Sequence, residues 1–83
     1  CGPCKVMDRE AFMDREVVGL INERFIPVQL DFDAQRKLAR EMRITAIPTV
    51  HVFAPNGDEL DRHTGLLDPA PMVAFLRESL RED

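Results

Sequence analysis

The chain of 83 residues contains no tryptophan and no tyrosine, and its aromatic share is only 6%. It also has no cluster of Lys and Arg, and its formal net charge is -4. Nucleic-acid surfaces need a basic patch and often aromatic stacking platforms, so this class of function is excluded. No apolar run approaches the length of a membrane span, and no basic, apolar leader precedes the first residue. We therefore expect no membrane insertion by this segment.

Metal-binding residues are also scarce, because the chain has only two cysteines and two histidines. His51 and His63 do not have the spacing of zinc-finger ligands, so we expect no metal. The pattern favours a partly buried, hydrogen-bonded structural role for His51 and a solvated position for His63. The length and the hydrophobic share of 45% predict one small domain over residues 1–83 with a modest core. The methionines at 7, 13, 42 and 72 are interpreted as packing residues.

Both cysteines stand at the start of the chain, in Cys1-Gly2-Pro3-Cys4. Residues three apart on the first turn of a helix lie on one face, so the two thiols can meet the Cα spacing that a disulfide needs. Pro3 suits a first helical turn, and Gly2 allows a tight backbone turn before it. Near the N-cap, free backbone N–H groups and the helix dipole favour the thiolate of Cys1 and lower its pKa. Cys4 should be less exposed, as a resolving thiol requires.

Three other interpretations of the cysteine pair stay open. A purely structural disulfide would close so short a loop that it would stabilise the fold little. A zinc site would need further ligands, for which only the two histidines are candidates. Cys1 could carry a lipid in an exported protein, although that would leave Cys4 unexplained.

The rest of the chain predicts helices and strands of ordinary length. Apolar spacing indicates helices that cover residues 5–11, 14–24, 34–42 and 69–80. Asp14, Asp33 and Asp68 are their predicted N-caps. β-type alternation indicates a strand over 26–32, a β-type run opened by Pro48 indicates a strand over 49–53, and a polar strand is expected over 59–64. Asn56-Gly57 predicts a tight hairpin turn between the last two.

Four of these features occur together in an order that resembles the thioredoxin family. They are Cys1-Gly2-Pro3-Cys4-Lys5 at a helix start, the Ile47-Pro48-Thr49 step into a strand, the Asn56-Gly57 hairpin, and Gly65 before the last helix. Residues 12–33 are more similar to the thioredoxin-like domains of exported thiol:disulfide interchange proteins. The resemblance implies an α/β, thioredoxin-like fold that lacks its N-terminal strand or strands, with a three-strand remnant sheet packed by helices. It also implies a bacterial periplasm or another exported compartment, with the cytoplasm as the alternative.

The resemblance further implies roles for the residues of the cysteine motif. Cys1 matches the attacking cysteine and Cys4 the resolving one. Gly2 and Pro3 match the dipeptide that tunes the redox potential. No cofactor is implied beyond the dithiol and disulfide forms of this pair.

A second set of residues matches the family's substrate groove. Pro48 matches a proline preceded by a cis peptide bond, and Ile47, Thr49 and Gly65 match its neighbours in the groove. Free backbone groups beside a cis proline can pair with an extended peptide in the manner of a β-strand.

The function that the resemblance implies is the reduction of protein disulfides, with disulfide-bearing proteins as substrates and an upstream dithiol as donor. The alternative is a non-catalytic, thioredoxin-like module that binds peptides at the Pro48 groove. Family members reach the cysteine motif from a central strand, with a Trp before the first cysteine and a buried acidic residue on that strand. The sequence contains none of these. We therefore expect that the natural protein is longer. The alternatives are that strands 26–32 and 49–53 pair directly, or that a second chain fills the gap as a strand-swapped dimer.

Overall fold

Four α-helices, one 3₁₀ helix and two strands make up residues 1–80, the part of the chain that the computed structural model describes. In chain order these elements are α1 (Gly2–Arg9), η1 (Ala11–Met13), α2 (Arg15–Arg24), α3 (Arg36–Glu41), β1 (Thr49–Phe53), β2 (Glu59–Thr64) and α4 (Pro69–Ser79). Within this described range, no helix has both the length and the apolar character needed to cross a membrane.

Local capping explains where α2 and α4 begin. The Asp14 carboxylate accepts hydrogen bonds from the backbone N–H groups of Glu16 and Val17, each at 3.1 Å, which confirms the predicted N-cap. Asp68 occupies the N-cap of α4 and Pro69 lies in its first turn, as predicted. The Asp68 side chain, however, makes no capping hydrogen bond.

β1 and β2 form the predicted antiparallel hairpin, in which Thr49 lies opposite Thr64 and His51 lies opposite Arg62. The turn uses Asn56-Gly57, where the Asn56 side-chain oxygen accepts a hydrogen bond of 3.0 Å from the Asp58 N–H. Gly57 has a φ of +97°, a conformation that glycine adopts without strain. Both strands have the predicted ranges.

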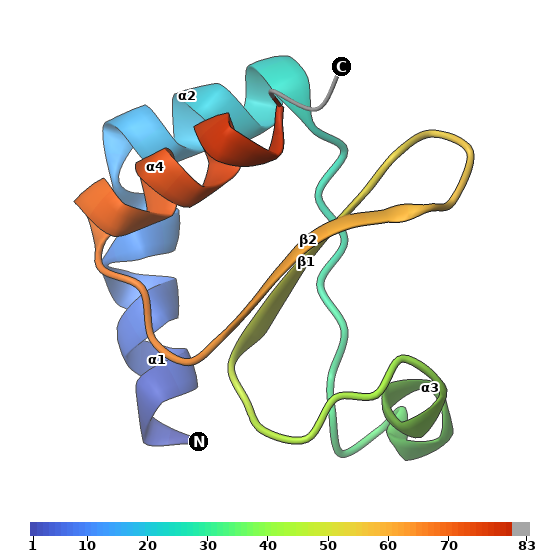
Figure 1. The fold of residues 1–83 in the computed structure, drawn as a ribbon. Coiled ribbons are helices and arrows are strands. Elements are labelled where there is room, and N and C mark those ends of the chain that lie inside the picture. Colours follow the sequence, from blue (N-terminus) through green and yellow to red (C-terminus); the bar gives the residue numbers. More distant parts are fainter. Residues whose placement is uncertain (81–83) are drawn as a thin grey trace.

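The hydrophobic core lies where α1, η1, α2 and α4 meet one side of the hairpin (Figure 1). Its buried side chains are Met7, Ala11, Val17, Val52, Leu67, Met72, Val73 and Leu76. The apolar face of α4 therefore packs as the spacing of its residues predicts. α3 lies apart from these helices, at the other end of the molecule (Figure 1).

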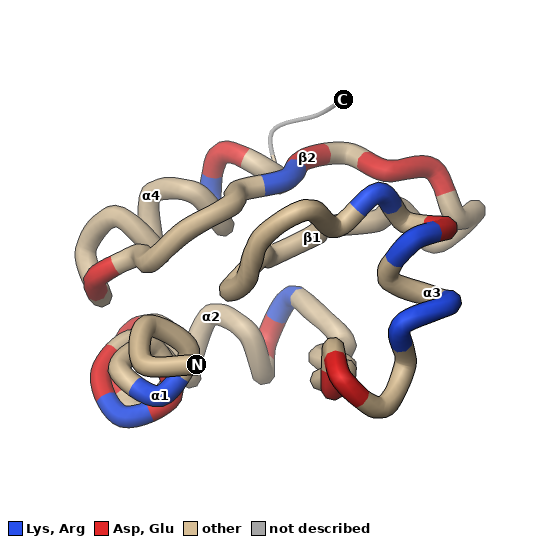
Figure 2. Tube along the Cα trace, turned by 90° about the horizontal axis from the view of Figure 1, so that it is seen from below, with Lys and Arg blue, Asp and Glu red and all other residues tan. Residues whose placement is uncertain are grey.

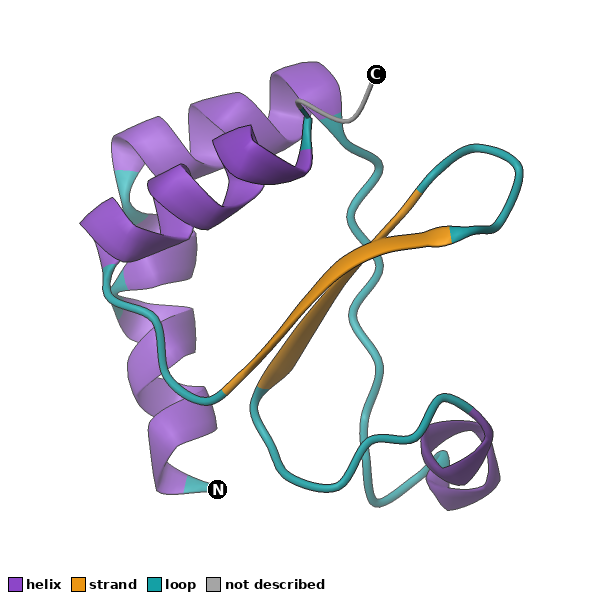
Figure 3. Cartoon of the chain, in the orientation of Figure 1, coloured by secondary structure: helices purple, strands orange, loops and turns teal. Residues whose placement is uncertain are grey.

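The predicted strand over residues 26–32 is wrong. The sheet of the described residues contains only β1 and β2, and Figure 3 shows the segment between α2 and α3 as an extended loop. Ile26, Val28 and Leu30 are 92%, 76% and 46% exposed. Alternation sets which face of a strand is apolar, but a strand also needs a hydrogen-bonding neighbour, and residues 1–80 supply none here. The remnant sheet thus has two strands instead of three, and this segment does not pair directly with β1.

Two helix boundaries also differ from the prediction. The opening helix ends at Arg9, and η1 follows it. α3 begins at Arg36, later than predicted, because the Asp31 carboxylate accepts hydrogen bonds from the N–H groups of Asp33 and Ala34 at 3.0 and 3.3 Å. This side-chain turn holds residues 31–34 out of the helix.

Charged residues of both signs are mixed along the described Cα trace (Figure 2). Lys and Arg alternate with Asp and Glu on α1, and an acidic stretch follows the hairpin turn into β2 (Figure 2).

Candidate active site

The cysteine motif forms the N-terminal end of α1. Cys1 is the N-cap residue, and its sulfur accepts a hydrogen bond of 3.2 Å from the backbone N–H of Cys4. The Cys1 carbonyl accepts a hydrogen bond of 3.3 Å from the Lys5 N–H. Pro3 lies in the first turn, where its missing N–H removes no intrahelical bond. The Cys1 sulfur therefore lies where backbone donors and the helix dipole both favour negative charge.

Cys1 and Cys4 are joined by a disulfide, with their Cα atoms 5.3 Å apart. As predicted, Cys1 is exposed and Cys4 is half-buried. The structure thus represents the oxidised form of the pair. Cys1 lies at the exposed end of α1, and Cys4 lies one helical turn further along it.

The loop before β1 holds the second group of predicted site residues. The Ile47–Pro48 peptide bond is cis, Pro48 is buried, and Ile47 is 38% exposed. The Thr49 hydroxyl donates a hydrogen bond of 2.6 Å to the Ala46 carbonyl, across the Ile47–Pro48 step. This bond closes the loop and leaves the Ile47 side chain partly at the surface.

Gly65 follows β2 and lies beside Pro48, to whose carbonyl its N–H donates a hydrogen bond of 2.8 Å. Its φ is +114°, in the range that disfavours any residue with a Cβ. A Cβ at this position would meet only the His63 ring nitrogen Nε2, at 4.0 Å, so the protein leaves space for it. The backbone conformation therefore explains why this position is glycine. Steric crowding within the described chain does not explain it. Its role in a substrate groove stays a prediction.

Met7 links the cysteine helix to this second group. Its thioether sulfur accepts a hydrogen bond of 3.4 Å from the Leu67 N–H, and both residues are buried. Met7 lies one helical turn after Cys4, and Leu67 follows shortly after Gly65. Figures 1 and 2 both place the N-terminus at the end of the molecule where β1 begins. The sequence pattern assigned Met7 to packing alone, and nothing local to Met7 predicts a contact with a loop so distant in the sequence.

His51 is partly buried on β1, as predicted, with its side chain 7% exposed, but the predicted hydrogen bond is absent. Neither ring nitrogen has a hydrogen-bond partner in the described structure, although Glu59 Oε1 lies 3.7 Å from Nδ1. Burial lowers the pKa of His51 below its ordinary value, the positive charge of Arg62 lowers it further, and the Glu59 carboxylate opposes both. Hydrogen bonds from Arg62 lower the pKa of Glu59.

His63 differs from its predicted solvated position. It is half-buried, and its ring lies edge-on to Phe75 with the ring centroids 6.0 Å apart. Within residues 1–80, no three His, Cys, Asp or Glu side chains come together as a metal site would require.

Comparison with known proteins agrees with this fold. Residues 1–80 match the model of the thioredoxin-like domain family. The chain is 32% identical to bovine (Bos taurus) mitochondrial thioredoxin over 94% of its own length and 45% of the relative. It is 36% identical to a mitochondrial thioredoxin domain-containing protein of Dictyostelium discoideum over 76% of the chain and 47% of the relative. It is also 37% identical to a thioredoxin of Echinococcus granulosus over 78% of the chain and 56% of the relative.

The chain therefore belongs to the thioredoxin-like domain family, whose members are thiol–disulfide oxidoreductases that use a cysteine pair and need no cofactor. Its helices and two-stranded sheet are consistent with a truncated form of that α/β fold. The chain spans about half the length of the curated relatives it matches. The mitochondrial names of two relatives do not support the exported compartment that the sequence resemblance implied.

Proposed function

We propose that the chain is a thiol:disulfide oxidoreductase that reduces protein disulfides through Cys1 and Cys4. The observation that carries the proposal is the position of the Cys1 sulfur, which is exposed at the tip of α1 and accepts the Cys4 N–H at 3.2 Å. The same donor would stabilise a Cys1 thiolate once the disulfide is reduced.

The proposed reaction begins with the reduced pair. The Cys1 thiolate attacks one sulfur of a substrate disulfide, so that the substrate S–S bond breaks and a Cys1–substrate disulfide forms. The departing substrate sulfur leaves as a thiolate and takes a proton from water. The Cys4 thiolate then attacks the Cys1 sulfur, which releases the second substrate thiolate and forms the Cys1–Cys4 disulfide. The substrate gains two electrons and the chain loses two, which an external dithiol must return.

Residues around Pro48 would bind the substrate. The loop is closed by the Thr49 and Gly65 hydrogen bonds, and it leaves Ile47 partly exposed. An extended peptide could pair with the backbone of Ile47 while its disulfide meets Cys1. The proposal covers this chemistry and names no compartment.

The test compares the wild-type chain with a Cys1→Ser variant. With excess dithiol, the wild type should accelerate reduction of a model protein disulfide, and the variant should not. The rate of thiol alkylation is then measured against pH, because a catalyst needs Cys1 to react well below the ordinary thiol pKa. Two thiols of equal and ordinary reactivity, with no acceleration by the wild type, would instead favour the non-catalytic peptide-binding module.

A further inference from the structure

α3 buries little apolar surface against the rest of the described fold. It is short, Arg36–Glu41, and Ala39 is its one buried residue. It also lies apart from the helices that build the core (Figure 1). The loop that contains Pro48 begins directly after this helix, so its geometry depends on how the end of α3 is held.

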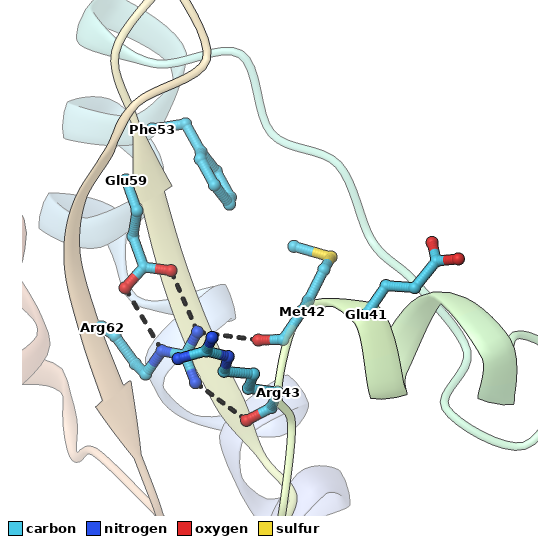
Figure 4. Close-up of a pocket in the computed structure, with 6 residues that line it drawn as sticks. All are labelled: Glu41, Met42, Arg43, Phe53, Glu59 and Arg62. Carbon is cyan, nitrogen blue, oxygen red and sulfur yellow. Dashed lines mark hydrogen bonds and ion pairs between the residues drawn. The ribbon is translucent and has the colours of Figure 1, made fainter.

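Arg62 of β2 holds that end (Figure 4). Its guanidinium donates hydrogen bonds to the carbonyls of Met42 and Arg43, at 2.7 and 2.9 Å. The Glu59 carboxylate accepts two more, at 3.0 and 3.3 Å, and so fixes the guanidinium in place. The two carbonyls lie at the negative end of the helix, where a cation is favourable and its hydrogen bonds are charge-assisted.

These carbonyls lie at the root of the Pro48 loop. Arg43 has a φ of +59°, which turns the chain out of the helix, and the Ile44 N–H returns to the Ala39 carbonyl at 2.9 Å. The other end of the loop is held where the Gly65 N–H meets the Pro48 carbonyl. β2 and the residue after it therefore fix both ends of a loop in which Thr45, Ala46 and Ile47 are exposed.

We propose that Arg62 is a positioning residue that orders residues 43–47 for pairing with an extended peptide substrate. This inference rests on the proposed function, because it assigns Arg62 a role in that same substrate site. Arg62 acts through the loop, since its guanidinium hydrogen-bonds to Met42, Arg43 and Glu59.

The first arm of the test separates large from small substrates. Arg62→Met keeps much of the side-chain volume and removes all four hydrogen bonds. We expect KM for a disulfide-bridged peptide to rise about tenfold, the equivalent of about 1.4 kcal/mol. The rate with 5,5′-dithiobis(2-nitrobenzoate), which has no backbone to pair, should stay within about twofold. Arg62→Lys keeps the charge without the planar fork and should give an intermediate KM.

The second arm measures amide hydrogen exchange in the oxidised wild type and in both variants. Exchange at residues 42–44 should become about tenfold faster in Arg62→Met, whereas α2 and α4 should be unchanged. Arg36→Met is the matched control, since Arg36 lies on α3 and its guanidinium contacts Asp33, at an exposed site, and the Phe32 ring, 5.9 Å from the ring centroid. It should change neither KM nor exchange.

Several outcomes would overturn the proposal. They are equal losses with both substrates, an unchanged peptide KM, or unchanged exchange at residues 42–44. If Arg62→Met does not fold, Arg62→Lys decides between the same outcomes. A wild-type chain that reduces no disulfide would refute the proposed function instead, and the exchange arm would still decide whether Arg62 orders the loop.

Discussion

Replacing Gly65 by alanine should destabilise the fold, although the space for the new methyl group is open. The nearest atom to an added Cβ is His63 Nε2 at 4.0 Å, so no steric clash contributes. The destabilisation therefore comes entirely from backbone strain, because a residue with a Cβ is strained at a φ of +114°. Alanine also lowers the conformational entropy of the unfolded chain, which partly offsets the strain. Strain of about 1–3 kcal/mol, reduced by this offset, gives an expected net loss of about 1–2 kcal/mol in the free energy of unfolding.

Gly19→Ala is the matched control for this substitution. Gly19 lies inside α2, and nothing stands within 4 Å of an added Cβ. The same change should therefore stabilise the chain by about 0.5–1 kcal/mol. Urea unfolding of the oxidised chain, followed by far-UV circular dichroism because the chain has no Trp or Tyr, gives both values. A Gly65→Ala chain as stable as the wild type, or shifts of the same sign in the two variants, would refute the reasoning.

Three further predictions test the cysteines, the buried histidine and the methionine link. Cys4→Ser should trap a peptide substrate as a mixed disulfide on Cys1, seen by mass spectrometry and released by dithiothreitol; a substrate that dissociates freely would contradict the assignment of the resolving thiol. The free energy of unfolding should fall as the pH drops below about 6.5, because the unfolded state takes up a proton that the lowered pKa of His51 resists in the folded state. His51→Leu should flatten this dependence in urea titrations between about pH 6.5 and 5, and an unchanged slope would assign it to another group. Met7→Leu should cost about 1 kcal/mol more than Met72→Leu, because only the first leaves a buried N–H without its acceptor; equal unfolding midpoints would show that the sulfur contact contributes nothing.

Elements fixed by neighbouring residues could be predicted from the sequence. The Asn56-Gly57 turn and the alternation on either side specify the hairpin locally, and Asp14 caps α2 through bonds to the next residues along the chain. The segment 26–32 has the same alternation as β1, yet it forms no strand. Pairing is a property of two segments, so periodicity in one of them cannot establish it.

In the candidate site, too, local features could be predicted from the sequence and long-range contacts could not. The spacing of Cys1 and Cys4 predicts their proximity and their different exposure, because both follow from one helical turn. The Met7–Leu67 bond joins residues 60 positions apart, and the Arg62–Met42 bond joins residues 20 apart. Neither has a local pattern that would indicate it. The residues that hold the site together were therefore beyond single-sequence reasoning, whereas those proposed to carry the chemistry were not.

Long-range hydrogen bonds from the hairpin position the loop of the candidate site, a role that the cysteine motif alone does not indicate. Arg62 reaches the end of α3 from within β2, and Gly65 meets Pro48 just after the same strand. A shift of one residue in the pairing of β1 and β2 would turn the Arg62 side chain to the other face of the sheet and displace Gly65 from Pro48. The Asn56-Gly57 turn that sets this register lies at the far end of the hairpin from the candidate site (Figure 1). The shape of the proposed peptide groove is thus set by strand register, while α1 sets only the position of the sulfur that would react within it.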